Sequence, residues 1–222
     1  MTAWRLDPLG EAAMLATLEA APDLDARARN AAALALAHYF ERCAGEARCE
    51  DGIESIVPAL DSVLIAFDPL RLPRAKVEAL LRQATALPVT DVAGRVAALP
   101  VRFGGADGPD LPDVAGALGL PPEEVVRQLC GSEWPVLMIG FAPGFPYLGP
   151  LPESLRLPRR STPRLAVPLG SVAIAAGMAG IYPARLPGGW HLVGRTDAIL
   201  FDPQRDPPAL LRAGDRVRFI PQ

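Results

Sequence analysis

Hydrophobic positions in residues 1–90 change period several times, which predicts a mixed domain of helices and strands. A helix is expected over residues 25–42, where apolar side chains recur at the spacing of one helix face. A second helix is expected over residues 74–86 for the same reason. Helices packed on one small sheet are the economical arrangement of such elements.

Two short segments between these helices have the apolar and β-branched content of strands. They cover residues 52–60 and 62–67, and Pro58 confines the first to a sheet edge or a bulge. The opening segment 11–20 is ambiguous, because its residues favour a helix but also fit a buried strand. Residues 1–90 are therefore expected to form a small α+β domain.

Residues 91–222 follow a different pattern, because helical periodicity nearly disappears. One short helix is expected to begin at Pro121 and Pro122, where two acids follow in the first turn. The rest consists of short apolar runs separated by Gly and Pro, at 135–141, 164–169, 171–176, 190–195, 198–201 and 216–220. This pattern predicts a β-barrel or sandwich, so the whole chain is expected to be α+β with a β domain over 91–222.

The overall charge excludes some partners. There are 22 basic and 25 acidic residues, a net charge of −3, which gives no general attraction to nucleic acid or anionic membranes. Uncharged runs at 134–152 and 165–184 have the length of a membrane span, but prolines and glycines interrupt both. Acids in the first dozen residues do not fit a signal peptide. We expect a soluble cytoplasmic protein that binds neither nucleic acid nor membrane.

Cysteine and histidine are scarce. Cys43, Cys49 and Cys130 form no CxxC pair, so reduced thiols are expected. His38 and His191 are the only histidines, which argues against a His-rich metal site, and no metal ligand is assigned. Cys130 is interpreted as a small buried residue rather than a nucleophile.

Positive charge gathers in residues 140–196. This region has a single acid, Glu153, and six arginines, at positions 156, 159, 160, 164, 185 and 195. Guanidinium groups bind carboxylate or phosphate through paired hydrogen bonds, so the region predicts a site for a small anion. Docking of an acidic partner and an ordinary solvated surface remain alternatives.

Two loops in this region combine Gly, Pro and aromatic residues, at 140–149 and 182–190. Their aromatic residues could line a flat-walled pocket, and they are Phe141, Phe145, Tyr147, Tyr182 and Trp190. Alternatively, these rings only plug the end of a barrel. His191 follows Trp190 and is expected to face either the pocket, as a base, or the core.

Several catalytic motifs are missing from the sequence. It contains no GxxxxGK[ST], no GxGxxG and no GxSxG, so a P-loop, a Rossmann fingerprint and a nucleophile elbow are excluded. The residues therefore identify no self-sufficient catalytic centre, and the catalytic residues stay unknown.

An ordered series of motifs nevertheless resembles a known family. GFAPGFPYLG is followed by PRR, PRLAVPLGSVAIA, GIYP, PGGW and GRT. Together they are similar to the KipI/PxpB family, also called allophanate hydrolase subunit 1 or carboxyltransferase subdomains C and D. Weaker similarity upstream and in LLRAGDRVRFIP extends the resemblance over nearly the whole chain.

The resemblance implies a small α+β N-terminal domain and a cyclophilin-like β-barrel domain. It also implies one subunit of a bacterial ATP-dependent 5-oxoprolinase, not active alone, which opens 5-oxo-L-proline to L-glutamate. Its partners would be a homologous KipA/PxpC-type subunit and a LamB/YcsF-type (PxpA) subunit, with ATP and magnesium bound at the level of the complex. A KipI-like regulator that inhibits a sensor histidine kinase is the alternative, and carboxyl transfer to a urea-like acceptor is a third.

The expected substrate site combines this resemblance with the arginine-rich loops. Its residues are Phe141, Pro143, Gly144, Phe145, Tyr147, Arg159, Arg160, Arg164, Tyr182, Pro187, Gly188, Gly189, Trp190 and Arg195. The chain departs from the family pattern at Leu129, usually His, and at Trp134, usually Tyr; Met178 and Ala179 replace Gln-Thr before GIYP. Neutral change at structural positions is one interpretation, and an altered substrate or lost activity is the other.

Overall fold

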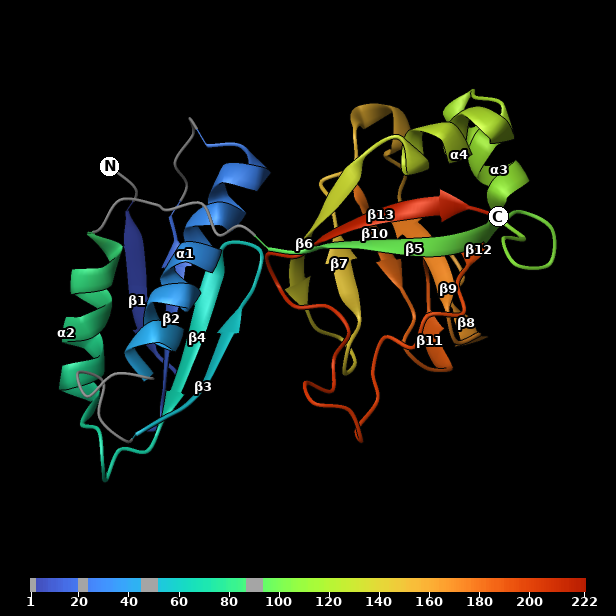
Figure 1. Ribbon diagram of the computed structural model, residues 1–222. Helices are drawn as coiled ribbons and strands as arrows, with labels where there is room; N and C mark the ends of the chain where they lie inside the picture. The colour runs from blue at the N-terminus through green and yellow to red at the C-terminus, as the bar shows by residue number, and fades with distance from the viewer. Residues whose placement is uncertain (1–2, 20–23, 45–51, 87–93) are drawn as a thin grey trace. The chain divides into compact units, whose positions relative to one another are not determined.

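A computed structural model describes residues 3–19, 24–44, 52–86 and 94–222 (Figure 1). The chain divides into two compact units, Met1–Ala93 and Gly94–Gln222. The expected domain boundary between residues 90 and 91 lies outside the described residues. Helices and strands occur in both units, and the expected α+β fold with a β-barrel is confirmed.

The first unit is a four-stranded antiparallel sheet with two helices. The strand order is β1-β2-β4-β3. The elements are β1 (Trp4–Pro8), β2 (Ala13–Leu18), α1 (Ala26–Ala44), β3 (Ile53–Pro58), β4 (Ser62–Phe67) and α2 (Arg74–Thr85). The ambiguous segment is therefore strand β2, and Pro58 lies in edge strand β3 as the sequence predicts.

Alternation along β2 and β4 explains why that sheet folds with its helices on one face. Every second residue of each strand is buried, as with Met14 in β2 and Ile65 in β4. These side chains pack in one cluster with Phe40 of α1 and Leu81 of α2. Removal of this apolar surface from water stabilises the unit.

The second unit is built on a closed seven-stranded barrel in the order β10-β7-β6-β13-β5-β12-β9. The barrel strands are β5 (Val96–Phe103), β6 (Glu133–Ile139), β7 (Pro146–Leu148), β9 (Ser171–Ala175), β10 (Met178–Ile181), β12 (His191–Arg195) and β13 (Arg216–Pro221). The last strand, β13, pairs in parallel with β5, the first. Outside the barrel, β8 (Arg164–Val167) and β11 (Leu186–Gly188) form a separate two-stranded sheet.

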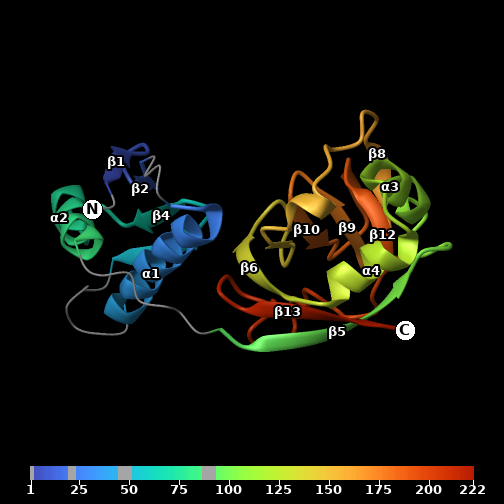
Figure 2. The same ribbon diagram turned by 90° about the horizontal axis from the view of Figure 1, so that it is seen from above.

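Two short helices pack on the barrel. They are α3 (Leu111–Leu118) and α4 (Pro122–Cys130), which contact each other and strands β12 and β13 respectively. Figures 1 and 2 both show them side by side. Among the helices of the described residues, none combines the length and apolar character needed to cross a bilayer.

Strand β9 is buried on both sides, which explains its unbroken apolar sequence. Val172 and Ile174 pack in the barrel core, whereas Ala173 and Ala175 pack in a second cluster with Phe145, Tyr182 and Trp190. Successive residues of a strand point to opposite faces. The aromatic cluster therefore covers the outer face of the barrel wall and does not plug the barrel.

Two features of the second unit differ from the expectation. Helix α3 is absent from the predicted elements, although Leu111, Val114 and Ala115 have helical spacing and are buried. The strand expected over 198–201 is wrong, since that segment forms only one isolated bridge, from Phe201 to Ala209. The carbonyl of Ile199 accepts a hydrogen bond from Arg205, whereas that of Leu200 accepts one of 2.8 Å from the amide of Leu210, so the backbone pairing is limited to this single bridge.

Two of the departures from the family pattern contact each other. The indole Nε1 of Trp134 donates a 2.7 Å hydrogen bond to the carbonyl of Leu129, and both residues lie in the barrel core. We expect Leu129→His to lower the free energy of unfolding by about 1–3 kcal/mol, because the buried imidazole gains no polar partner. Adding Trp134→Tyr should recover part of this loss, since a phenol supplies a partner. Urea denaturation of the single and double variants measures the energetic coupling between positions 129 and 134. Strictly additive losses of unfolding free energy would contradict this coupling.

Candidate functional site

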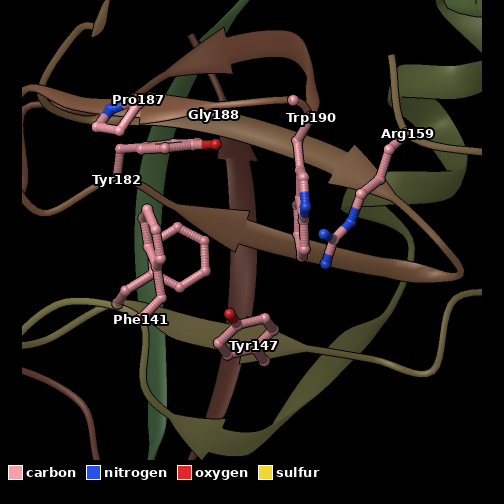
Figure 3. A pocket seen from close by; sticks show the side chains of 9 residues that line it. Phe141, Tyr147, Arg159, Tyr182, Pro187, Gly188 and Trp190 are labelled. Atoms are coloured by element: carbon pink, nitrogen blue, oxygen red, sulfur yellow. The ribbon is translucent and has the colours of Figure 1, made fainter. Parts of the chain in front are cut away.

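A cavity of about 160 Å³ lies beside the aromatic cluster (Figure 3). It is smaller than the roughly 300–1,000 Å³ of pockets for drug-sized ligands, so its size suits a small molecule. Its lining consists of Phe141, Phe145, Tyr147, Arg159, Tyr182, Pro187, Gly188, Gly189 and Trp190. All nine belong to the fourteen residues expected from the sequence.

Phe145 organises the aromatic wall of the cavity. Its ring centroid lies 5.0 Å from that of Tyr147, 5.2 Å from that of Tyr182 and 5.9 Å from that of Trp190. The last two contacts are edge-to-face, which is a favourable geometry for aromatic rings. Gly180 makes room for this packing, because a Cβ there would lie 2.6 Å from Phe145 Cζ.

A second close approach sets the position of Tyr182. A Cβ built on Gly188 would overlap the hydroxyl of Tyr182 and lie 2.8 Å from its Cζ. Tyr182 is only 2% exposed and packs edge-to-face against Phe141 and Phe145, so its ring has little freedom to move aside. Glycine at position 188 therefore allows the phenol to lie against strand β11.

Phe141 lines the cavity from a strained loop. Its φ is 69°, in the left-handed region that a bulky residue rarely adopts, and the residue is 59% exposed. Backbone strain of this kind costs about 1–3 kcal/mol and is common where a loop clamps a ligand. The conformation places a large apolar ring at an accessible side of the cavity (Figure 3).

The two tyrosine hydroxyls are suited to donate hydrogen bonds. Burial raises the pKa of Tyr147, and the charge of Arg159 opposes this only partly. Burial also raises the pKa of Tyr182, with a further increase from Tyr147. Both phenols are consequently neutral near pH 7 and keep their protons for a ligand oxygen.

Arg159 supplies the positive charge of the cavity. It is exposed and lines the cavity, and its charge acts to lower the pKa of both Tyr147 and Tyr182. Within the described residues, no ion pair involves Arg159. Figure 3 shows its guanidinium beside the ring of Trp190. The arrangement is suited to bind a small flat molecule with one carboxylate.

Arg160 and Arg164, expected in the same site, do not line the cavity. Both bind the buried carboxylate of Asp110. Arg164 donates two hydrogen bonds of 2.7 and 2.8 Å, and Arg160 donates one of 3.1 Å. The amide of Leu192 donates a fourth, of 2.7 Å. The charges of these arginines are thus partly neutralised within the fold.

The three remaining expected residues also lie outside the cavity lining. Pro143 is exposed in the loop that carries Phe141, and Gly144 is buried against Leu200. Arg195 ends strand β12, and its buried Nε has no hydrogen-bond partner among the described residues. The structure therefore brings together the aromatic residues, the glycines and Arg159, but not all of the arginines.

Two residues near the site have roles that the sequence does not predict. The local pattern indicates Asp110 only as a turn carboxylate that binds backbone amides, and His191 only as a base or a core residue. His191 Nε2 lies 3.0 Å from the carbonyl oxygen of Pro158, so it donates to that oxygen. Asp110 and His191 are far apart in the chain, and the sequence alone gives no reason to join them.

The Asp110 carboxylate makes the stability of the fold depend on pH in the acidic range. Burial alone would raise its pKa, but hydrogen bonds from Arg164 and Leu192, with the charges of Arg164 and Arg160, hold the pKa below its ordinary value. Stability from the ionised group is therefore complete above the unfolded-state pKa of about 4 and is lost as the pH falls through the folded-state value.

We expect the difference in unfolding free energy between the native chain and Asp110→Asn to be largest at neutral pH. It should narrow as the pH falls from about 4 through the lowered folded-state pKa of Asp110, because the native carboxylate then becomes protonated. Urea denaturation across this range measures the difference. A difference in unfolding free energy that stays constant as the pH falls would contradict the stabilising role of the ionised Asp110 carboxylate.

The described parts of the chain give little support to a metal site or a cysteine nucleophile. No group of three or more His, Cys, Asp or Glu is placed there to hold a metal ion. Cys43 and Cys130 are free thiols, and burial raises the pKa of Cys130, which disfavours the thiolate. Cys49 lies outside the described residues.

Comparisons with known proteins agree with this architecture. The crystal structure of TTHA0988 has 41% sequence identity to this chain and a TM-score of 0.76. The crystal structure of PH0987 from Pyrococcus horikoshii has 34% sequence identity and a TM-score of 0.57. The match with TTHA0988 covers 87% of this chain, and the match with PH0987 covers 98%. It spans 37% of the length of TTHA0988 and 97% of PH0987. Urea amidolyase from Kluyveromyces lactis has a similar fold, with a TM-score of 0.75 at 21% identity.

Sequence comparisons identify relatives that are named as subunits of 5-oxoprolinase. The Escherichia coli O157:H7 protein is 46% identical over 75% of this chain and 77% of its own length. The Haemophilus influenzae protein is 42% identical over 80% of this chain and 83% of its own length. The model of the family described as carboxyltransferase domain, subdomain C and D, matches residues 4–211. The chain therefore belongs to the carboxyltransferase subdomain C and D family, together with these 5-oxoprolinase subunits.

Proposed function

We propose that this chain is a subunit of an ATP-dependent 5-oxoprolinase, in which the cavity of the second unit binds 5-oxo-L-proline. The observation that carries the proposal is the Arg159 guanidinium in a small aromatic-walled cavity, without an ion pair among the described residues. Relatives named as 5-oxoprolinase subunits support the same activity. We also propose that the second domain, residues 91–222, holds this site by itself.

The lining offers a partner for each part of this substrate. Arg159 binds the carboxylate through charge-assisted hydrogen bonds, which are stronger than neutral ones. Trp190 and Phe141 cover the flat five-membered ring. The neutral hydroxyls of Tyr147 and Tyr182 donate to the lactam oxygen, which holds the carbonyl in place and polarises it.

ATP and magnesium do not fit this cavity. Its volume is small for a nucleotide, and the lining contains one cationic side chain and no carboxylate for a metal ion. ATP held on another subunit would supply a phosphoryl group that makes the unstrained lactam easier to open, with ADP as the leaving group. We therefore place the nucleotide on the KipA/PxpC-type or LamB/YcsF-type subunit, and the assembled enzyme in the cytoplasm where ATP is available.

Reconstitution tests the proposal. The chain is combined with the KipA/PxpC-type and LamB/YcsF-type subunits of its source organism, and L-glutamate released from 5-oxo-L-proline is measured with and without ATP. We expect ATP-dependent release that stops when any one subunit is omitted. Full release without this chain would overturn the proposal. Stoichiometric binding to a sensor histidine kinase, with no turnover, would support the regulatory function instead.

A further inference from the structure

The turn that carries Arg159 is fixed on both sides of that residue. Before it, His191 Nε2 donates to the carbonyl oxygen of Pro158 at 3.0 Å. After it, the amide of Arg160 donates to the carbonyl oxygen of Gly189 at 2.8 Å. Gly189 itself lines the cavity, so the turn is attached directly to the cavity wall.

Asp110 adds a third attachment through the side chain of Arg160. Its carboxylate is 5% exposed and lies at the start of helix α3, far from residue 160 in sequence. It also binds Arg164 at the start of strand β8 and the amide of Leu192 in strand β12. One buried group therefore joins the Arg159 turn to the barrel wall and to the β8–β11 sheet.

The same carboxylate separates the three arginines into two classes. Arg160 and Arg164 are 29% and 26% exposed and are bound to Asp110, whereas Arg159 is exposed and lines the cavity. Without Asp110, two partly buried guanidinium groups would lose their counter-charge, and they would turn toward solvent or toward the anion site. Asp110 thus keeps Arg160 and Arg164 away from the cavity and leaves Arg159 to face it.

We propose that Asp110 is a positioning residue, which together with His191 holds the 158–160 turn so that Arg159 points into the cavity. Its effect on ligand binding rests on the proposed function, but the placement of Arg159 does not. Loss of either attachment lets Arg159 leave the cavity, while the aromatic walls remain.

Side-chain NMR tests the placement without any ligand. The Nε–H signals of Arg159, Arg160 and Arg164 are assigned by single arginine-to-lysine substitutions in the full chain. Held side chains near aromatic rings are expected to give signals displaced from those of a free arginine. In Asp110→Asn we expect all three signals to move toward the free position, and Asp113→Asn, an exposed acid on the same helix, should leave them unchanged.

A second pair of variants keeps the test decisive if Asp110→Asn does not fold. His191→Leu removes the donor to Pro158 and should shift the Arg159 signal while the Arg164 signal stays in place. His191→Gln keeps an amide donor at the same reach and should restore the native Arg159 signal. An Arg159 signal that is unchanged in folded Asp110→Asn, or in His191→Leu, would overturn the proposal.

Binding of 5-oxo-L-proline, measured by calorimetry on the same samples, separates this inference from the proposed function. We expect affinity to fall at least about tenfold in Asp110→Asn or His191→Leu and to stay native in Asp113→Asn and His191→Gln. Undiminished affinity in a variant whose Arg159 signal has moved would overturn the positioning role. No binding to any sample would contradict the proposed function, and the NMR signals would still decide where Asp110 places Arg159.

Discussion

Arg159→Gln should weaken binding of 5-oxo-L-proline by about ten- to a hundredfold. Arg159 is the cationic residue of the cavity lining, and a hydrogen bond to a charged group contributes about 1.5–3 kcal/mol. The fold should be unaffected, because Arg159 is exposed and takes no part in the ion pairs of Asp110. Calorimetry measures the affinity, and the reconstituted complex should lose turnover by a similar factor.

Arg185→Gln is the matched control for this substitution. Arg185 lies in the same basic region and is exposed, but it is not part of the cavity lining. Its loss removes the same formal charge and should change affinity less than about threefold. Equal losses for both variants would mean that the general positive field, not the Arg159 contact, attracts the ligand.

Gly188→Ala should abolish binding and lower the free energy of unfolding by about 1–3 kcal/mol, the usual cost of overpacking. The new Cβ would occupy the place of the Tyr182 hydroxyl, and that ring is enclosed by Phe141 and Phe145. Displacing Tyr182 disturbs the wall of the cavity. Thermal unfolding and calorimetry measure the two effects.

The adjacent glycine provides a close control. A Cβ at Gly189 meets its nearest neighbour, Pro163, at 3.7 Å, an ordinary contact distance, so Gly189→Ala should bind and unfold nearly as the native chain does. Adding Tyr182→Phe to Gly188→Ala removes the overlapping oxygen and should restore part of the stability. Similar effects for the two glycine variants would contradict the role of the Tyr182 contact.

Most of the fold could be predicted from local pattern because its elements bury one regular face. Helix α2 and strand β4 have clean periods of about 3.6 and 2, and each lies where the pattern places it. Strand β2 remained ambiguous because Ala and Leu favour helices, and packing against α1 and α2 decided its conformation. The parallel pairing of β5 with β13 joins the two ends of the second unit, which local pattern does not reveal.

The aromatic part of the site was predictable because Gly, Pro and aromatic residues concentrate in two loops. The different roles of the arginines were not. Arg159 and Arg160 are adjacent and chemically identical, and only the contact of Arg160 with the distant Asp110 separates their roles. A buried acid that neutralises part of a basic region leaves no local signal in the sequence.

The structure also locates the departures from the family pattern. Leu129, Trp134 and Ala179 lie in the barrel core, away from the cavity lining. Met178 packs against the aromatic cluster that includes Phe145 and Trp190, so it is the departure placed to influence the cavity. Met178→Gln is therefore the informative substitution if the native complex proves weak with 5-oxo-L-proline.

A crystal structure of the assembled complex with bound 5-oxo-L-proline tests the central claim most directly. We predict electron density for the ligand in the cavity of this chain, with its carboxylate on Arg159 and its ring between Trp190 and Phe141. Density for the ligand on another subunit, with this cavity holding only water, would contradict the account.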